Sequence, residues 1–194
     1  MLSRAPSPLH RPHPTRPRPH RARALRHWLE APGSLTARLR TLGSVRVQVC
    51  RQGSGRLGQA ERRALGLTAG HIREVLLLVD DQPAVWARSV TSHRALRGPW
   101  RALKGLGSRP LAELLFSAHR VSRGPLHDHP WPARGDDARR ARRHWGLSDR
   151  SGRRPHPPVC ARASVFRHHG AALRVMEAFA PWLACRTAGP RRLR

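Results

Sequence analysis

The chain has 194 residues, which is enough for one domain of ordinary size, and it carries a net charge of +27. Its longest apolar stretch, Val75–Val79, is far shorter than the roughly 18–20 residues of a bilayer span, which excludes a transmembrane helix. The three cysteines, Cys50, Cys160 and Cys185, are widely separated and form no CxxC pair. This spacing favours a reducing compartment, and we expect a cytoplasmic protein.

More than half of the positive charge lies in three segments that do not resemble a folded core: residues 1–24, 122–158 and 186–194. Lys104 is the only lysine, so arginine supplies the rest, as a GC-rich coding bias would produce. A solvated, compositionally biased surface therefore explains the charge better than a specific nucleic-acid partner does, although any basic protein attracts phosphate nonspecifically.

Residues 1–24 contain six prolines, six arginines and no acidic residue. Because this segment has no apolar periodicity, it cannot bury enough surface to offset its ordering entropy, and we predict a disordered tail. Residues 186–194 are expected to form a second basic tail. A single domain is then left over residues 25–185.

The first elements of this domain are helical. A short element is expected at Leu25–Leu29, and Ser34 is a plausible N-cap for a second helix. The apolar positions of that helix fall at i, i+4 and i+7, on Leu35, Leu39 and Leu42. Val45–Val49 then alternates like a strand, and residues 51–58 are expected to form a glycine-rich turn without the spacing of a P-loop.

Two hairpins and one further helix follow. The first hairpin is predicted from His71–Val79 and Ala84–Val90, and the second from Val159–Arg167 and Ala171–Phe179. Ser108-Arg109-Pro110 is expected to open a short helix between them. The proline-, arginine- and histidine-rich residues 122–158 are expected to be a long insertion or a lid. Strands joined by short turns, with helices between, predict an α+β domain with an antiparallel sheet.

Each hairpin carries a charge among apolar neighbours. Alternation puts Arg73 on the face of Val75 and Leu77, and Glu177 on the face of Val175. The opposite faces are also partly apolar, so the pattern leaves the inward direction open. The two charges could pair with each other or with Glu74 and Arg174, or they could line a small site for an anion that carries a polar group at its far end. Arg88 could be a second anion contact or part of a structural pair.

Six segments, in this order, resemble the chorismate lyase family. They are Ser34-Leu35-Thr36 with Arg38-Leu39, Arg73-Glu74-Val75-Leu76-Leu77, Ala87-Arg88-Ser89-Val90, Leu106-Gly107-Ser108-Arg109-Pro110-Leu111 with Leu115-Phe116, Ala161-Arg162-Ala163-Ser164-Val165-Phe166, and Met176-Glu177-Ala178-Phe179-Ala180-Pro181. Together they cover roughly residues 25–184. The chain departs from the family pattern in the length of residues 122–158 and in Cys160, Ala163 and Ala180, which stand where tryptophan, arginine and leucine are common.

The resemblance implies a chorismate pyruvate-lyase, which eliminates pyruvate from chorismate and leaves 4-hydroxybenzoate for ubiquinone biosynthesis. By this resemblance, Arg73 binds the ring carboxylate and Glu177 faces the hydroxyl at the opposite end. Leu35 and Leu111 contact the ligand through backbone groups and enclosing side chains. The catalytic residues would be Glu177 and Arg73. Because the product is aromatic, the elimination is downhill, and no cofactor or metal is expected. We expect a monomer.

Three other interpretations compete with this one. Effector-sensing domains of bacterial repressors share the fold family, but they follow a winged helix that residues 1–24 cannot form. A basic nucleic-acid-binding protein is less favoured because the six tryptophans are scattered and no module motif is present. A metal site is disfavoured because the histidines match no standard spacing; these are His127, His129, His144, His156, His168 and His169.

Overall fold

The computed structural model describes residues 23–117, 120–132, 134–148 and 156–186. Almost all of the two predicted tails, 1–24 and 186–194, lies outside these ranges. The described residues form a seven-stranded antiparallel sheet in the order β1-β2-β3-β7-β6-β4, with β5 also paired to β6. The predicted α+β class is confirmed.

The strands are β1 (Val45–Arg56), β2 (Ala69–Val79), β3 (Gln82–Thr91), β4 (Val121–Arg123), β5 (His127–Pro130), β6 (Cys160–His168) and β7 (Ala171–Phe179). The α-helices are α2 (Arg26–Leu29), α3 (Leu35–Arg40), α4 (Gln59–Leu65), α5 (His93–Arg97), α6 (Leu111–Ser117) and α7 (Asp136–Ser148). Two 3-10 helices, η1 (Arg101–Gly105) and η2 (Pro181–Cys185), complete the described elements.

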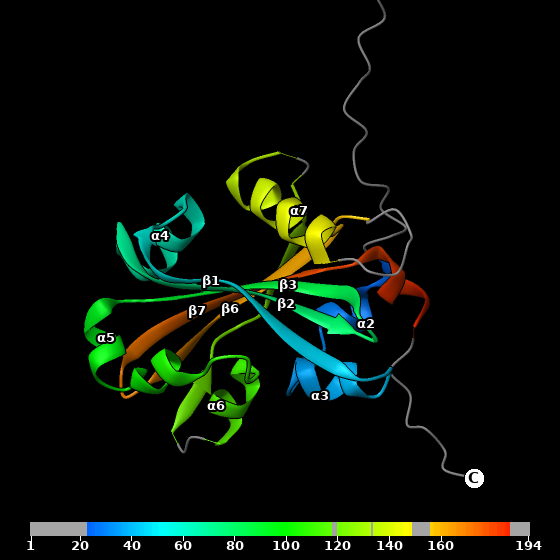
Figure 1. Ribbon diagram of the computed structural model, residues 1–194. Helices are drawn as coiled ribbons and strands as arrows, with labels where there is room; N and C mark the ends of the chain where they lie inside the picture. The colour runs from blue at the N-terminus through cyan, green and yellow to red at the C-terminus, as the bar shows by residue number, and fades with distance from the viewer. Residues whose placement is uncertain (1–22, 118–119, 133, 149–155, 187–194) are drawn as a thin grey trace, which may run out of the picture.

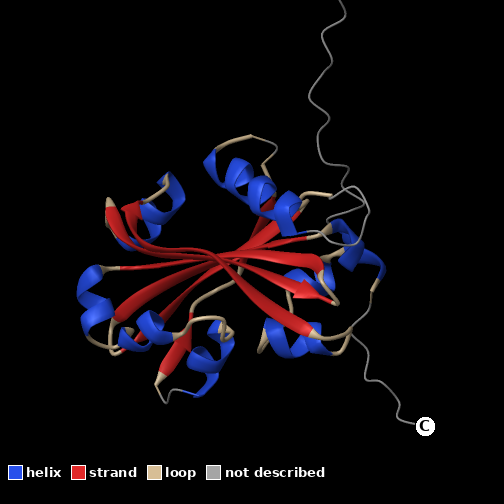
Figure 2. Ribbon diagram, viewed as in Figure 1, coloured by secondary structure: helices blue, strands red, loops and turns tan. Residues whose placement is uncertain are grey.

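The sheet separates two layers of helices. Helices α4 and α7 lie on one face, whereas α3 and α6 lie on the other (Figure 1). Figure 2 shows the strands crossing between these layers with a marked twist, as expected for a sheet of L-residues. Every pairing in the sheet is antiparallel. Each strand therefore presents alternate side chains to the α3/α6 layer and to the α4/α7 layer.

Both predicted hairpins are confirmed, and two-residue turns close them. Asp80 and Asp81 have φ values of 46° and 61°, and His169 and Gly170 have φ values of 46° and 75°. Two successive positive φ values match the twist of the flanking strands in a hairpin. The carboxylate of Asp80 also accepts a hydrogen bond from the Ser44 backbone N–H at 2.8 Å.

The prediction of a glycine-rich turn over residues 51–58 is wrong. Residues up to Arg56 continue β1, with Gly53 opposite Ile72 and Gly55 opposite Gly70. The register shifts between Val49 and Arg51, so a bulge bends the strand where the alternation of the sequence ends. The sequence interpretation also missed helix α4, because its single buried residue is the glutamate Glu61 and its apolar stripe is weak.

Much of the predicted insertion, residues 122–158, is regular structure. It contains β5, most of β4 and the 13-residue helix α7. The buried Ala138, Ala141 and Trp145 fix α7 to the molecule. Helix α7 lies in the same layer as α4 (Figure 1). It can therefore act as a lid only over a site on that face of the sheet.

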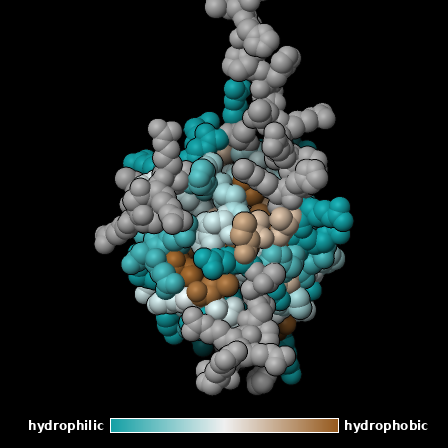
Figure 3. Space-filling model, turned by 90° about the vertical axis from the view of Figure 1, so that its right-hand side faces the viewer, coloured by the Kyte–Doolittle hydropathy of each residue, from teal (hydrophilic) through white to brown (hydrophobic). Residues whose placement is uncertain are grey.

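Apolar side chains fill the space between the layers. The largest fully buried ones include Trp28, Trp86, Trp100 and Phe179. Figure 3 shows one end of the molecule, where small apolar patches are set among mostly hydrophilic residues. Within the described ranges, no helix has the length and apolar character that would let it cross a bilayer.

Candidate active site

A pocket lies between the α3/α6 layer and the sheet. It contains about 620 Å³ of empty space, a figure that includes its open mouth. Its charged lining residues are Arg73, Arg123, Arg162 and Glu177. The apolar lining includes Leu35, Val75, Leu77, Leu111, Leu115, Phe166 and Val175.

The strand register brings the two predicted charges to this one pocket. Arg73 on β2 is opposite Ser89 on β3, and Ser89 is opposite Val175 on β7. Glu177 follows Val175 by two residues, so it lies on the same face of the sheet. Two strand spacings across and one two-residue step along put the Cα atoms of Arg73 and Glu177 roughly 12 Å apart. The inward direction that the sequence left open is thus the face shared with Val75 and Val175.

Arg73 is buried without an acidic partner. Only 2% of the residue is exposed, and its Nη2 donates to the carbonyl oxygens of Gly107 at 2.8 Å and Arg109 at 3.2 Å. Its Nε has no hydrogen-bond partner among the residues that the structure describes. Burial lowers the pKa of the Arg73 guanidinium. Among the described residues, no carboxylate lies within ion-pair distance of Arg73, so its charge is available to an anion in the pocket.

Glu177 pairs with an arginine that the sequence interpretation did not include in the site. Arg162, directly opposite on β6, donates from Nε to Glu177 Oε2 at 2.6 Å. Its Nη1 donates to the carbonyl oxygens of Trp28, Leu29 and Ala31. These bonds fix the guanidinium at the end of α2, so Arg162 holds one oxygen of Glu177 in place.

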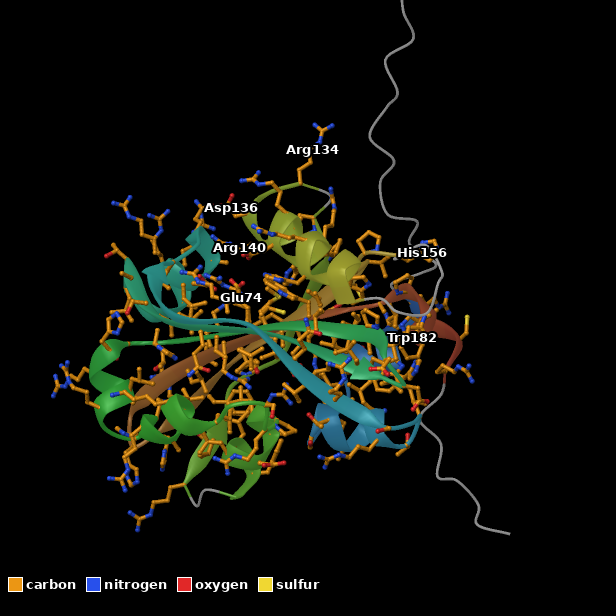
Figure 4. All side chains as sticks on the ribbon, viewed as in Figure 1. Glu74, Arg134, Asp136, Arg140, His156 and Trp182 are labelled. Carbon is orange, nitrogen blue, oxygen red and sulfur yellow. The ribbon has the colours of Figure 1, made fainter. Side chains whose placement is uncertain are left out.

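The structure therefore excludes the proposed pairing of Arg73 with Glu177. It also excludes pairing of these two charges with Glu74 and Arg174, because Glu74 binds Arg88 and Glu177 binds Arg162. Arg88 therefore forms a structural ion pair and is not a second anion contact. Its side chain points to the opposite face of the sheet from Arg73. Figure 4 shows Glu74 and Arg140 between the sheet and α7, where Arg140 Nη1 lies 3.9 Å from Glu74 Oε1.

The two predicted leucines reach the pocket from the helical layer. Leu35 begins α3, and Ser34 caps that helix as expected, accepting a hydrogen bond from the Ala37 N–H at 3.1 Å. Leu111 begins α6. Both residues line the pocket opposite the sheet. Helix α7 lies on the other face of the sheet and is not a lid over this pocket.

The structure adds Arg162 and Arg123 to the predicted lining residues. A signal for Arg162 was present in the sequence, because alternation puts it on the same face as Cys160 and Phe166, with an alanine on each side of it in the chain. Arg123 gave no such signal, since it ends a three-residue strand within the segment that we interpreted as an insertion. In the part of the chain that the structure describes, no three His, Cys, Asp or Glu side chains are grouped to hold a metal ion.

Comparison with known proteins gives a family match. Residues 19–148 match the family model described as "Chorismate lyase". A protein of Azoarcus sp. (strain BH72) named "Probable chorismate pyruvate-lyase" is 47% identical over 165 residues, which covers 82% of this chain and 85% of that protein. A protein of the same name from Albidiferax ferrireducens is 42% identical over 165 residues and covers 81% of this chain and 83% of that protein.

Solved structures show a weaker likeness. The effector domain of PhnF from Mycobacterium smegmatis has a TM-score of 0.47 and 16% identity, covering 76% of this chain and 88% of that chain. A ligand-binding domain of a GntR-family regulator from Bordetella bronchiseptica has a TM-score of 0.45 and 16% identity, covering 71% of this chain and 84% of that one.

Proposed function

Because the chain belongs to the chorismate lyase family, we propose that it eliminates pyruvate from chorismate and releases 4-hydroxybenzoate. The observation that supports this activity best is the charge arrangement of the pocket. Arg73 is buried at one side with no acidic partner in the part of the chain that the structure describes, and Glu177 lies at the other. A ligand with a carboxylate at one end and a hydroxyl at the other complements both groups.

Arg73 would bind the ring carboxylate. A guanidinium offers a planar, permanently charged fork that fits a carboxylate. Burying a guanidinium without a counter-ion costs free energy, and an incoming carboxylate offsets that cost. Leu35 and Leu111 would enclose the ring from the side of the helices.

Glu177 would face the C4 hydroxyl. Arg162 holds Oε2 of this carboxylate, and no described residue donates a hydrogen bond to Oε1. An acceptor is therefore free at the place where the hydroxyl group would lie. The same oxygen is positioned to assist removal of the C4 hydrogen, although transfer of that hydrogen to the departing side chain would need no protein base.

The reaction breaks the bond between C3 and the ether oxygen, and the ring loses its C4 hydrogen. The electron pair of the ether bond leaves with the enolpyruvyl oxygen, and the enolpyruvate gains a proton to become pyruvate. Because the ring becomes aromatic, the elimination is downhill. The work of the pocket is then to hold the reactive conformer and to stabilise the charge that develops on the leaving group.

We also place this enzyme in the cytoplasm as a monomer that serves ubiquinone biosynthesis. The cysteines support a reducing compartment, since Cys50, Cys160 and Cys185 are all free thiols. Burial raises the pKa of the Cys160 thiol to about 12, so this thiol stays protonated and unreactive at neutral pH. Gel filtration at micromolar concentration tests whether the protein is a monomer.

The decisive experiment gives the purified full-length chain chorismate and nothing else, with a chelator in a parallel reaction. We expect pyruvate and 4-hydroxybenzoate in equal amounts, at the same rate with and without the chelator. Folding is followed by circular dichroism. A well-folded protein that forms neither product contradicts the proposed function.

A further inference from the structure

A second cation with no acidic partner among the described residues faces the same pocket. Arg123 ends β4 opposite Phe166 on β6, and its guanidinium lies 5.3 Å from the centre of the Phe166 ring. Its Nε donates to the Ser164 hydroxyl oxygen at 3.2 Å. The ring and the hydroxyl fix the side chain toward the pocket, where it is a lining residue.

The lining of the pocket carries more positive than negative side chains. Three arginines line it together with a single glutamate, and Arg162 already binds that glutamate. Arg73 and Arg123 have no carboxylate within 4.0 Å in the described part of the chain. Burial and the like charge of Arg162 both lower the pKa of Arg123, while Glu177 raises it. A carboxylate that enters the pocket beside Arg123, in addition to the one at Arg73, would therefore stabilise this cation.

Chorismate carries two carboxylates, one on ring carbon C1 and one on the enolpyruvyl group at C3. Carbon C4, with the hydroxyl, is next to C3 and opposite C1. If Arg73 holds the C1 carboxylate and Glu177 faces the C4 hydroxyl, the enolpyruvyl group must lie on the Glu177 side of the pocket. Across the sheet, strand β4 is on that side, because the order runs β2-β3-β7-β6-β4. Along the strands, Arg123 lies opposite Phe166, and its Nε reaches back to Ser164, two residues from the Glu177 partner Arg162.

Building on the proposed function, we propose that Arg123 binds the carboxylate of the enolpyruvyl group. The substrate makes this contact and the aromatic product does not, because the contacted carboxylate leaves with pyruvate. Arg123 thus distinguishes substrate from product, whereas Arg73 binds the carboxylate that both share. The same cation stabilises the negative charge that develops on the departing enolpyruvate.

The test compares substrate and product in one variant. Arg123→Met keeps an apolar stem against Phe166 and removes the charge. We expect its kcat/KM for chorismate to fall roughly 10- to 100-fold, as for loss of a hydrogen-bonded ion pair. The inhibition constant of 4-hydroxybenzoate should stay within about twofold of the wild-type value, since the product lacks the group that Arg123 binds. Arg167→Gln, at an exposed arginine on β6 that does not line the pocket, is the matched control and should change neither constant.

The outcomes separate this inference from the proposed function. A wild-type chain that forms no pyruvate contradicts the proposed function itself. An active wild type with unchanged kcat/KM in Arg123→Met overturns only the role of Arg123, and so does a variant that loses product binding by the same factor. If Arg123→Met does not fold, the Arg123→Lys variant tests the proposed contact instead. It lacks the planar fork, and we expect kcat/KM to fall about 3- to 5-fold, so a wild-type value overturns the proposal.

Discussion

Two buried arginines on neighbouring strands have opposite surroundings. Arg73 on β2 and Arg88 on β3 are 2% and 1% exposed. Arg88 donates to Glu61 at 2.6 and 3.0 Å and also to Glu74. Within the described ranges, the hydrogen bonds of Arg73 go to two backbone carbonyls beside a pocket and to no carboxylate. Burial alone therefore does not distinguish a structural charge from a functional one. The distinction is whether the protein itself supplies the counter-ion.

This contrast predicts opposite consequences for stability and activity. The largest effect is expected for Arg88→Met, which leaves Glu61 buried without its ion-pair partner and Glu74 with only the longer contact to Arg140. Breaking a buried ion pair from one side costs about 3–5 kcal/mol. Urea unfolding should show this loss, while kcat/KM per folded molecule stays near the wild-type value. A variant of wild-type stability would show that the cluster is not structural.

Arg73→Met should have the opposite effect, a loss of activity with little change in stability. We expect kcat/KM for chorismate to fall about 100- to 1,000-fold, because the ring carboxylate loses a buried ionic partner. The urea midpoint should stay near wild type, since no carboxylate among the described residues depends on this charge. Steady-state kinetics and unfolding on the same preparation make the comparison. Collapse of the fold in this variant would assign Arg73 to the core instead of the ligand.

A smaller effect is expected at Arg162, which contacts Glu177 and acts through it. Arg162→Met should lower kcat about tenfold, the usual consequence of losing a hydrogen bond to a charged group. KM should change little, because Arg73 still anchors the substrate. Arg162→Lys can restore the contact with Glu177 and should recover part of kcat. A variant in which KM rises and kcat is unchanged would argue against a positioning role.

The smallest effect is expected in how the free energy of unfolding decreases at acidic pH. Burial by itself raises the pKa of Glu61, but the hydrogen bonds and charge of Arg88 outweigh it, and the net pKa lies below the ordinary value of 4.5. A depressed pKa in the folded state contributes stability above pH 4.5 that is lost as the pH falls through the folded value. Glu61→Gln should flatten that acid decline in urea unfolding, whereas Glu30→Gln, at an exposed pair with Arg26, should not.

The sequence pattern predicted those parts of the fold in which local chemistry is decisive. Alternation located the β2–β3 and β6–β7 hairpins, and the Ser34 cap located α3. The pattern failed at residues 51–58, where glycines suggested a turn but pairing with β2 continues the strand. It failed again at α4, whose one buried side chain is a glutamate. In both places a partner distant in the sequence supplies the stabilising contact.

For the site, the sequence by itself determined which residues share a face, because the period of a strand is fixed by its backbone geometry. Arg73 and Glu177 were identified in this way, and the family resemblance added Leu35 and Leu111. Only the tertiary structure decided which charges are satisfied within the protein. That outcome depends on which strands become neighbours: β6 brings Arg162 to Glu177, β3 brings Arg88 to Glu74, and none of the described strands brings a carboxylate to Arg73.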